Sequence, residues 1–156
     1  MRARDLMVRR VAAVRPDETL AHAASVMRDH ECGSVVVLMP GGHVVAMLTD
    51  RDICMAALRA DRLLSDLRVE QAMSRALHAC GPDDDLATVQ DIMSLHQVRR
   101  LPVVDSEQRI LGIVSIDDIA RAAQRQANLL APGVRTAAVG RTLGEICRPH
   151  LVEDQP

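Results

Sequence analysis

The sequence predicts an α/β (α+β) fold of two β-α-β-β-α repeats that pack on each other across a pseudo-twofold axis. First, the chain aligns with itself at a shift of 66 residues, the separation of Met7 and Met73. Second, a Ser/Thr-x-x-Asp pattern ends an apolar strand in both copies, within 45–53 and within 111–119. Third, 156 residues with 48% hydrophobic and 26% charged residues suffice for a substantial core.

The internal repeat holds without a gap across residues 5–57. Pro16 aligns with Pro82 and Asp52 with Asp118, and many positions between them keep their apolar character. A solenoid needs three or more repeats, whereas two copies can bury their apolar faces against each other. The repeat therefore predicts a pair rather than an extended array.

Each repeat is predicted to open with a short helical turn, a short strand and a helix that follows a Pro-Asp pair. Proline fixes φ at about −65° and aspartate caps the first turn, while apolar spacing of i, i+3, i+4 and i+7 indicates a face that packs on a sheet. Two strands and a closing helix complete each unit. The predicted elements are 4–7, 11–14, 19–29, 34–39, 43–48 and 50–58 in the first copy, and 70–73, 77–80, 85–95, 100–105, 109–114 and 116–127 in the second.

The domain boundaries follow from the repeat. Residues 1–66 are predicted to form the first repeat with its connecting segment, 67–127 the second repeat, and 128–156 a C-terminal helix and tail. The connecting residues 59–68 are too apolar for a free linker, so we expect them to lie against the pair.

The C-terminal segment lies outside the repeat. After a break at Pro132 and Gly133, a short amphipathic helix is expected to place Val139, Leu143 and Ile146 on one face. The last eight residues, from Pro149 onward, are expected to form a frayed tail.

Composition excludes several classes of function. The net charge of −2, without a basic tail, gives no electrostatic footprint for nucleic acid. The absence of Phe, Trp and Tyr removes the platforms on which bases stack, and without lysine there is neither Schiff-base chemistry nor a P-loop. No apolar run approaches the ~18 residues of a membrane helix. With no signal peptide at the start, the sequence predicts a cytoplasmic protein.

Catalytic and metal-binding patterns are not recognised either. No Ser/His/Asp or Cys/His pair has supporting motif context, so we predict no enzyme activity and no catalytic residue. The four cysteines contain no Cys-x-x-Cys pair, and no metal site is predicted. A weaker hypothesis makes the chain a thiol or metal sensor, with Cys147 as the most exposed thiol.

The two Ser/Thr-x-x-Asp turns allow two interpretations. In a capping box, the hydroxyl of Thr49 or Ser115 accepts from the aspartate amide, while the carboxylate of Asp52 or Asp118 reaches back. Because both turns recur in one repeat register, they also suit the floor of two ligand sites. The roles can coexist, since a cap uses only part of a carboxylate.

The repeat resembles the cystathionine-β-synthase (CBS) domain family in its stand-alone tandem form, the Bateman module. The residues that carry the resemblance are the turns 48–53 and 114–119, supported by 96–105 and by the turns at Met7 and Met73. The resemblance covers about residues 3–123, and the tail around 143–148 is similar to that of small bacterial members.

The resemblance implies two clefts between the repeats, in which the Ser/Thr and Asp of one repeat work with early strands of the other. In the family, the aspartate accepts hydrogen bonds from both ribose hydroxyls of an adenine nucleotide. This suits a carboxylate, which has two acceptor oxygens. The first implied site comprises Thr49, Asp52, Leu77, His78, Val98, Arg99 and Arg100, and the second comprises Ser115, Asp118, Val11, Ala12, Cys32, Gly33 and Ser34.

The two implied sites differ in charge. Arg99 and Arg100 align with Gly33 and Ser34, so only the first site is expected to have built-in cations. A nucleotide with phosphates is therefore expected to prefer the Asp52 site. The alternative is that these arginines pair with surface acids, as many exposed arginines do.

The resemblance thus implies a regulatory module that binds AMP, ADP, ATP, NAD or S-adenosylmethionine and signals to an unidentified protein partner. No further cofactor is required. A homodimer is expected through the helices 19–29, 50–58, 85–95 and 116–127, and neither nucleic acid nor a membrane is expected as a partner. The alternative function is a ligand-free dimeric scaffold.

Overall fold

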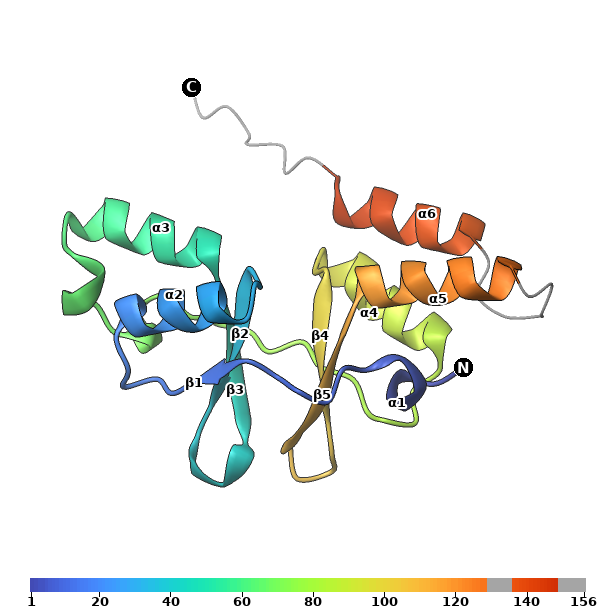
Figure 1. The fold of residues 1–156 in the computed structure, drawn as a ribbon, viewed down its shortest axis with the longest axis horizontal. Helices are drawn as coiled ribbons and strands as arrows, with labels where there is room; N and C mark the ends of the chain where they lie inside the picture. Colours follow the sequence, from blue (N-terminus) through green and yellow to red (C-terminus); the bar gives the residue numbers. More distant parts are fainter. Residues whose placement is uncertain (129–135, 149–156) are drawn as a thin grey trace.

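The computed structural model describes residues 1–128 and 136–148, and it has the predicted two α/β halves side by side (Figure 1). No helix in these described ranges has the length and apolar character needed to cross a membrane. In sequence order, the first repeat contributes α1 (Ala3–Leu6), β1 (Ala13–Val14), α2 (Leu20–Asp29), β2 (Ser34–Leu38), β3 (Val44–Thr49) and α3 (Asp50–Ala60). The rest of the chain contributes α4 (Leu86–His96), β4 (Arg100–Val104), β5 (Ile110–Ser115), α5 (Ile116–Asn128) and α6 (Thr136–Ile146). Short 3₁₀ helices lie between β2 and β3 at Pro40–Gly42, and between α3 and α4 at Leu64–Asp66 and Val69–Gln71.

The two small sheets have the same topology except at their first strand. In the first sheet, β1 runs parallel to β2, and β2 runs antiparallel to β3. In the second, β4 and β5 are antiparallel, and a single parallel bridge joins Cys80 to Val103. These two residues align with Val14 and Val37 of the first sheet, so the repeat is preserved at this point.

The predicted strand 77–80 is shortened to that bridge because of Pro102. In the first repeat, the Val36 amide donates to the Ala12 carbonyl at 3.0 Å. Pro102 takes the place of Val36 and has no N–H, so the equivalent bond to His78 cannot form. The His78 carbonyl therefore lacks the sheet hydrogen bond that the Ala12 carbonyl accepts.

The short helical turn that opens each repeat packs in the core of the other repeat. Ala3 and Leu6 of α1 belong to the core of the second repeat, whereas Leu67 and Val69 belong to the core of the first. Paired bridges hold this exchange, Arg2 with Asp85 and Thr19 with Arg68. Both cores thus draw on residues beyond the predicted division at 66/67, and that division stays a prediction.

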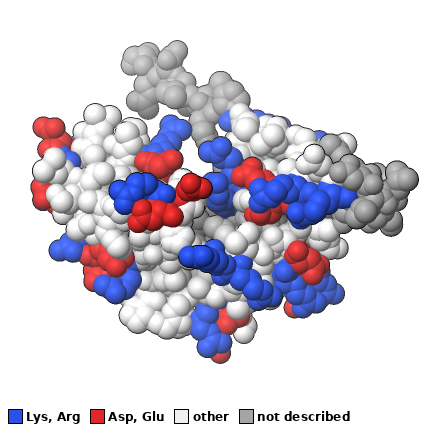
Figure 2. Space-filling model, in the orientation of Figure 1, with Lys and Arg blue, Asp and Glu red and all other residues white. Residues whose placement is uncertain are grey.

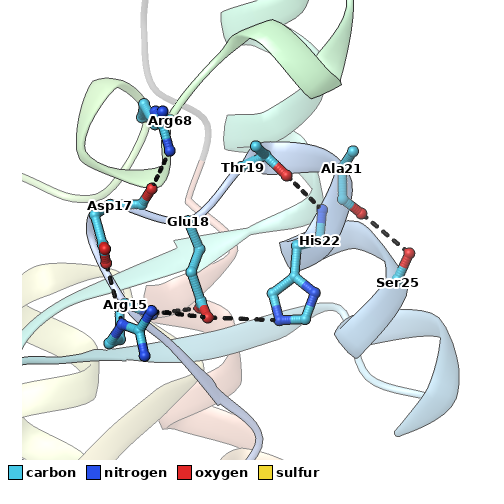
Figure 3. A network of polar contacts seen from close by, with 8 residues as sticks. All are labelled: Arg15, Asp17, Glu18, Thr19, Ala21, His22, Ser25 and Arg68. Carbon is cyan, nitrogen blue, oxygen red and sulfur yellow. Dashed lines mark hydrogen bonds and ion pairs between the residues drawn. The ribbon is translucent and has the colours of Figure 1, made fainter.

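Contacts just before α2 hold the end of the connecting segment, residues 59–68, as Figure 3 shows for Arg68. The Thr19 hydroxyl accepts from the His22 amide at 3.1 Å and caps the helix. The Arg68 guanidinium donates to the Asp17 carbonyl, and the Arg15 side chain holds the pKa of the Asp17 carboxyl below its usual range. The prediction that the connecting residues lie against the pair is confirmed at this joint.

The helix α6 packs on α4 and α5, as Figure 1 shows for α5. Its inner face differs from the predicted one: Thr142 is buried, whereas Leu143 is 44% exposed. Thr142 tolerates burial because its hydroxyl donates to the Ala138 carbonyl at 3.1 Å. Val139 and Ile146 do contact the core of the second repeat, as predicted. The break at 132–133 and the tail from 149 lie outside the described residues.

Candidate ligand-binding clefts

Both strand-to-helix turns form the predicted capping boxes. The Asp52 carboxylate accepts from the Thr49 amide at 2.9 Å and from its hydroxyl at 2.7 Å, both on Oδ2. Asp118 Oδ2 accepts from Ser115 in the same way, at 2.9 and 2.5 Å. One oxygen of each carboxylate is thus committed to the cap, which leaves Oδ1 for other partners.

A cavity of about 370 Å³ lies beside Asp118, which we call the second cleft. It brings together residues of both repeats, since Val11 and Cys32 face Ser115 and Asp118 across it. Six of the seven residues predicted for this site line it, and Gly33 lines the neighbouring cavity instead. The six are Val11, Ala12, Cys32, Ser34, Ser115 and Asp118.

A cavity of about 450 Å³ lies beside Thr49, which we call the first cleft. Four of its predicted residues line it, namely Thr49, Val98, Arg99 and Arg100. The other three do not: Asp52 and His78 line no described cavity, and Leu77 lines a separate one near the β4–β5 turn. Asp52 therefore touches the first cleft only through Thr49, which lines it.

One difference between the repeats is a pair of histidines. The rings of His78 and His96 stack with centroids 3.7 Å apart and an angle of 16° between their planes. Their counterparts in the first repeat are Ala12 and His30, and both of these line the second cleft. The second cleft thus has the small side chain of Ala12 at the position where the second repeat has the ring of His78.

The stack also makes the stability of the fold depend on pH. Burial, and then the nearby His96, hold the pKa of His78 below its usual 6.5. The unfolded chain therefore binds a proton more readily than the folded one, so stability is full above pH ~6.5 and is lost as the pH falls below it. We expect acid to lower the thermal midpoint less in His78→Ala than in the parent chain. An equal pH dependence in both would contradict this assignment.

The expected difference in cations between the clefts is wrong. The second cleft is lined by three arginines, Arg10, Arg100 and Arg121, and Arg100 also lines the first cleft. Figure 2 shows basic side chains, with acidic ones beside them, around the groove between the two halves. Arg121 could have been found from the sequence, since position i+3 of a helix lies beside Asp118. The sequence gives no comparable indication that Arg10 lines this cleft.

Ser34 lies where the two clefts meet. It lines both cavities, is only 7% exposed, and its hydroxyl has no hydrogen-bond partner among the described residues. A buried hydroxyl without a partner costs about 1–3 kcal/mol in stability. A ligand that reaches Ser34 can satisfy this group.

The cysteines differ in accessibility. Cys54 and Cys147 are exposed, Cys32 is partly buried, and burial raises the pKa of the Cys80 thiol to about 12. Among residues 1–128 and 136–148, no cluster of three or more His, Cys, Asp or Glu side chains is placed to hold a metal ion.

The shared clefts and the repeated turns agree with the comparisons to known proteins. The family model of the CBS domain matches twice, at residues 3–59 and 67–125. The chain belongs to the CBS domain family. It is 37% identical over 117 residues to the CBS domain-containing protein YhcV of Bacillus subtilis, covering 75% of this chain and 81% of that protein.

Solved structures show the same CBS pair. The crystal structure of Hypoxic Response Protein I with two coordinated zinc ions has a TM-score of 0.71 and 34% identity, covering 78% of this chain and 98% of that one. The CBS domain pair of protein MJ0100, in complex with 5-methylthioadenosine and S-adenosyl-L-methionine, has a TM-score of 0.70 and 24% identity, with the same coverages.

Relatives that are named as enzymes match over a small part of their length. Two homoserine O-acetyltransferases and an inosine-5'-monophosphate dehydrogenase each align over 23% of their own chains. Their similarity to this chain lies in the CBS domains, which are regulatory modules in proteins of this family.

Proposed function

We propose that this CBS pair is a regulatory module that binds an adenosine-containing ligand in the second cleft. The observation that carries the proposal is a cavity lined both by a capped carboxylate, Asp118, and by Ser34, whose buried hydroxyl has no hydrogen-bond partner among the described residues. The complex of MJ0100 with S-adenosyl-L-methionine supports this class of ligand, because that protein has the same fold.

The chemistry of the second cleft suits a nucleoside. Asp118 is an acceptor, so its Oδ1 can receive the hydroxyl protons of a ribose. Val11 and Ile113 provide apolar walls for the base, and the arginines provide donors for an anionic group. The residues assigned to the first site, Thr49, Asp52, Val98, Arg99 and Arg100, stay proposed ligand residues, and we propose that the histidine stack limits their use.

Cys32 provides a test that needs no variant. Because Cys32 lines the second cleft, AMP at saturating concentration is expected to slow its alkylation by iodoacetamide about tenfold or more, as mass spectrometry of peptides would show. The exposed Cys54 and Cys147 should react at unchanged rates, and the buried Cys80 should stay unmodified. Protection of none of the thiols by AMP, ATP, NAD or S-adenosylmethionine would favour the ligand-free scaffold.

We further propose that the signal passes through a homodimer in the cytoplasm. The predicted dimer surface is reduced in this chain, because α6 packs on α4 and α5. Within the described part of the chain, α3 exposes Met55 at 38% and Leu58 at 72%. Exposed apolar side chains of this kind suit a partner surface. The thiols of Cys32, Cys54, Cys80 and Cys147 are free, which agrees with a reducing compartment.

A further inference from the structure

The Asp118 carboxylate is already occupied from within the chain. Its Oδ2 accepts the capping bonds from Ser115, and its Oδ1 forms an ion pair with the Arg121 guanidinium. Arg121 lies one helical turn after Asp118 on α5 and lines the second cleft. A ribose that uses Oδ1 must therefore compete with Arg121.

The first repeat shows what this carboxylate is like without the arginine. The counterpart of Arg121 is Met55, and Asp52 Oδ1 has no hydrogen-bond partner among the described residues. The capping bonds at the two turns agree to within 0.2 Å. The capped turn therefore forms with the same geometry whether or not the carboxylate has an ion-pair partner.

We propose that Arg121 makes the second cleft selective for adenosine ligands that carry an anionic group, such as a phosphate. A neutral nucleoside that takes Oδ1 leaves the guanidinium without its counter-ion. A phosphate offers the released guanidinium a new partner, and a charge-assisted bond of similar strength replaces the one that was broken. This inference rests on the proposed function and deepens it by naming the ligand class.

The charge balance of the cleft acts in the same direction. Its lining carries three arginines against two aspartates, Asp117 and Asp118, and Arg100 lies 4.0 Å from Asp117 as an ion pair. The excess positive charge favours AMP over adenosine and disfavours S-adenosylmethionine, whose sulfonium and ammonium cations outweigh its carboxylate. The Arg121 side chain is 58% exposed, so a ligand in the cleft can reach its guanidinium.

Calorimetric titration of AMP, adenosine and S-adenosylmethionine into the full chain tests the proposal. The parent chain is expected to bind AMP at least about tenfold more tightly than adenosine. In Arg121→Met, which copies the first repeat, the affinity for adenosine should rise and that for AMP should fall. The control Arg125→Met removes the same charge one turn further along α5, from a residue that lines no described cavity, and should leave the ratio unchanged.

The outcomes separate this inference from the proposed function. If the parent chain binds AMP and adenosine equally, or if Arg121→Met changes both affinities by the same factor, the selectivity assigned to Arg121 is wrong and the ligand site stands. If neither the parent chain nor Arg121→Met binds any of the three ligands, the proposed function fails as well.

Discussion

Replacing Ala12 by histidine is expected to weaken ligand binding in the second cleft strongly. The substitution gives the first repeat the residue that the second repeat has at His78, opposite an existing partner, His30. The introduced ring should stack on His30 as His78 stacks on His96, with centroids about 3.7 Å apart. A base cannot enter a space filled in this way. We expect the affinity for AMP to fall by about 100-fold, since overpacking costs about 1–3 kcal/mol even where neighbours adjust.

The fold should survive this change. Ala12 is only partly buried, its carbonyl still accepts from the Val36 amide, and the new ring enters an open cavity. The thermal midpoint should therefore move little, as for most substitutions outside a core. Ala12→Ser is the matched control, because its small side chain leaves the cavity open and should keep the affinity. Unchanged AMP binding in Ala12→His would show that the ligand does not use this cleft.

The order of elements could be predicted because it depends on local patterns that the repeat shows twice. The capping boxes at Thr49 and Ser115 follow from four-residue spacings, and the strands follow from continuous apolar runs. One local rule was missed, since Pro102 in β4 removes a donor and shortens the strand before it. Predicting that effect requires knowing which segment pairs with β4, and the sequence alone does not reveal this.

The clefts could be predicted only in part, because their use depends on contacts between segments. Val11 and Cys32 were assigned to the second cleft through the family resemblance, and the structure places them there. The stacking of His78 on His96 joins residues 18 apart in the chain, and no local pattern predicts it. Similarly, Thr142 replaces Leu143 on the inner face of α6 because a hydroxyl can bond to the helix backbone, which apolar spacing alone does not reveal.

Replacing His78 by alanine is expected to open the first cleft and add a second binding site. Position 78 would then match Ala12, while His96 already matches His30. With the stack removed, Asp52 can face the cavity that Thr49, Arg99 and Arg100 line. Because Asp52 Oδ1 has no ion-pair partner among the described residues, a ribose meets no internal competitor there. We expect the calorimetric stoichiometry for AMP to rise from one to two per chain, one for each cleft.

A second binding site in His78→Ala would show that the histidine stack, and no other difference between the repeats, keeps AMP out of the first cleft. Losing an aromatic pair costs about 0.5–1.5 kcal/mol of stability, which a folded domain tolerates. The double variant His78→Ala/Asp52→Ala should return the stoichiometry to one, because it removes the ribose acceptor of the opened cleft alone. If His78→Ala still binds a single AMP, the stack does not close the first cleft. The failure of AMP to bind there would then be due to the backbone around Pro102, where the second repeat has a single bridge in place of the strand β1.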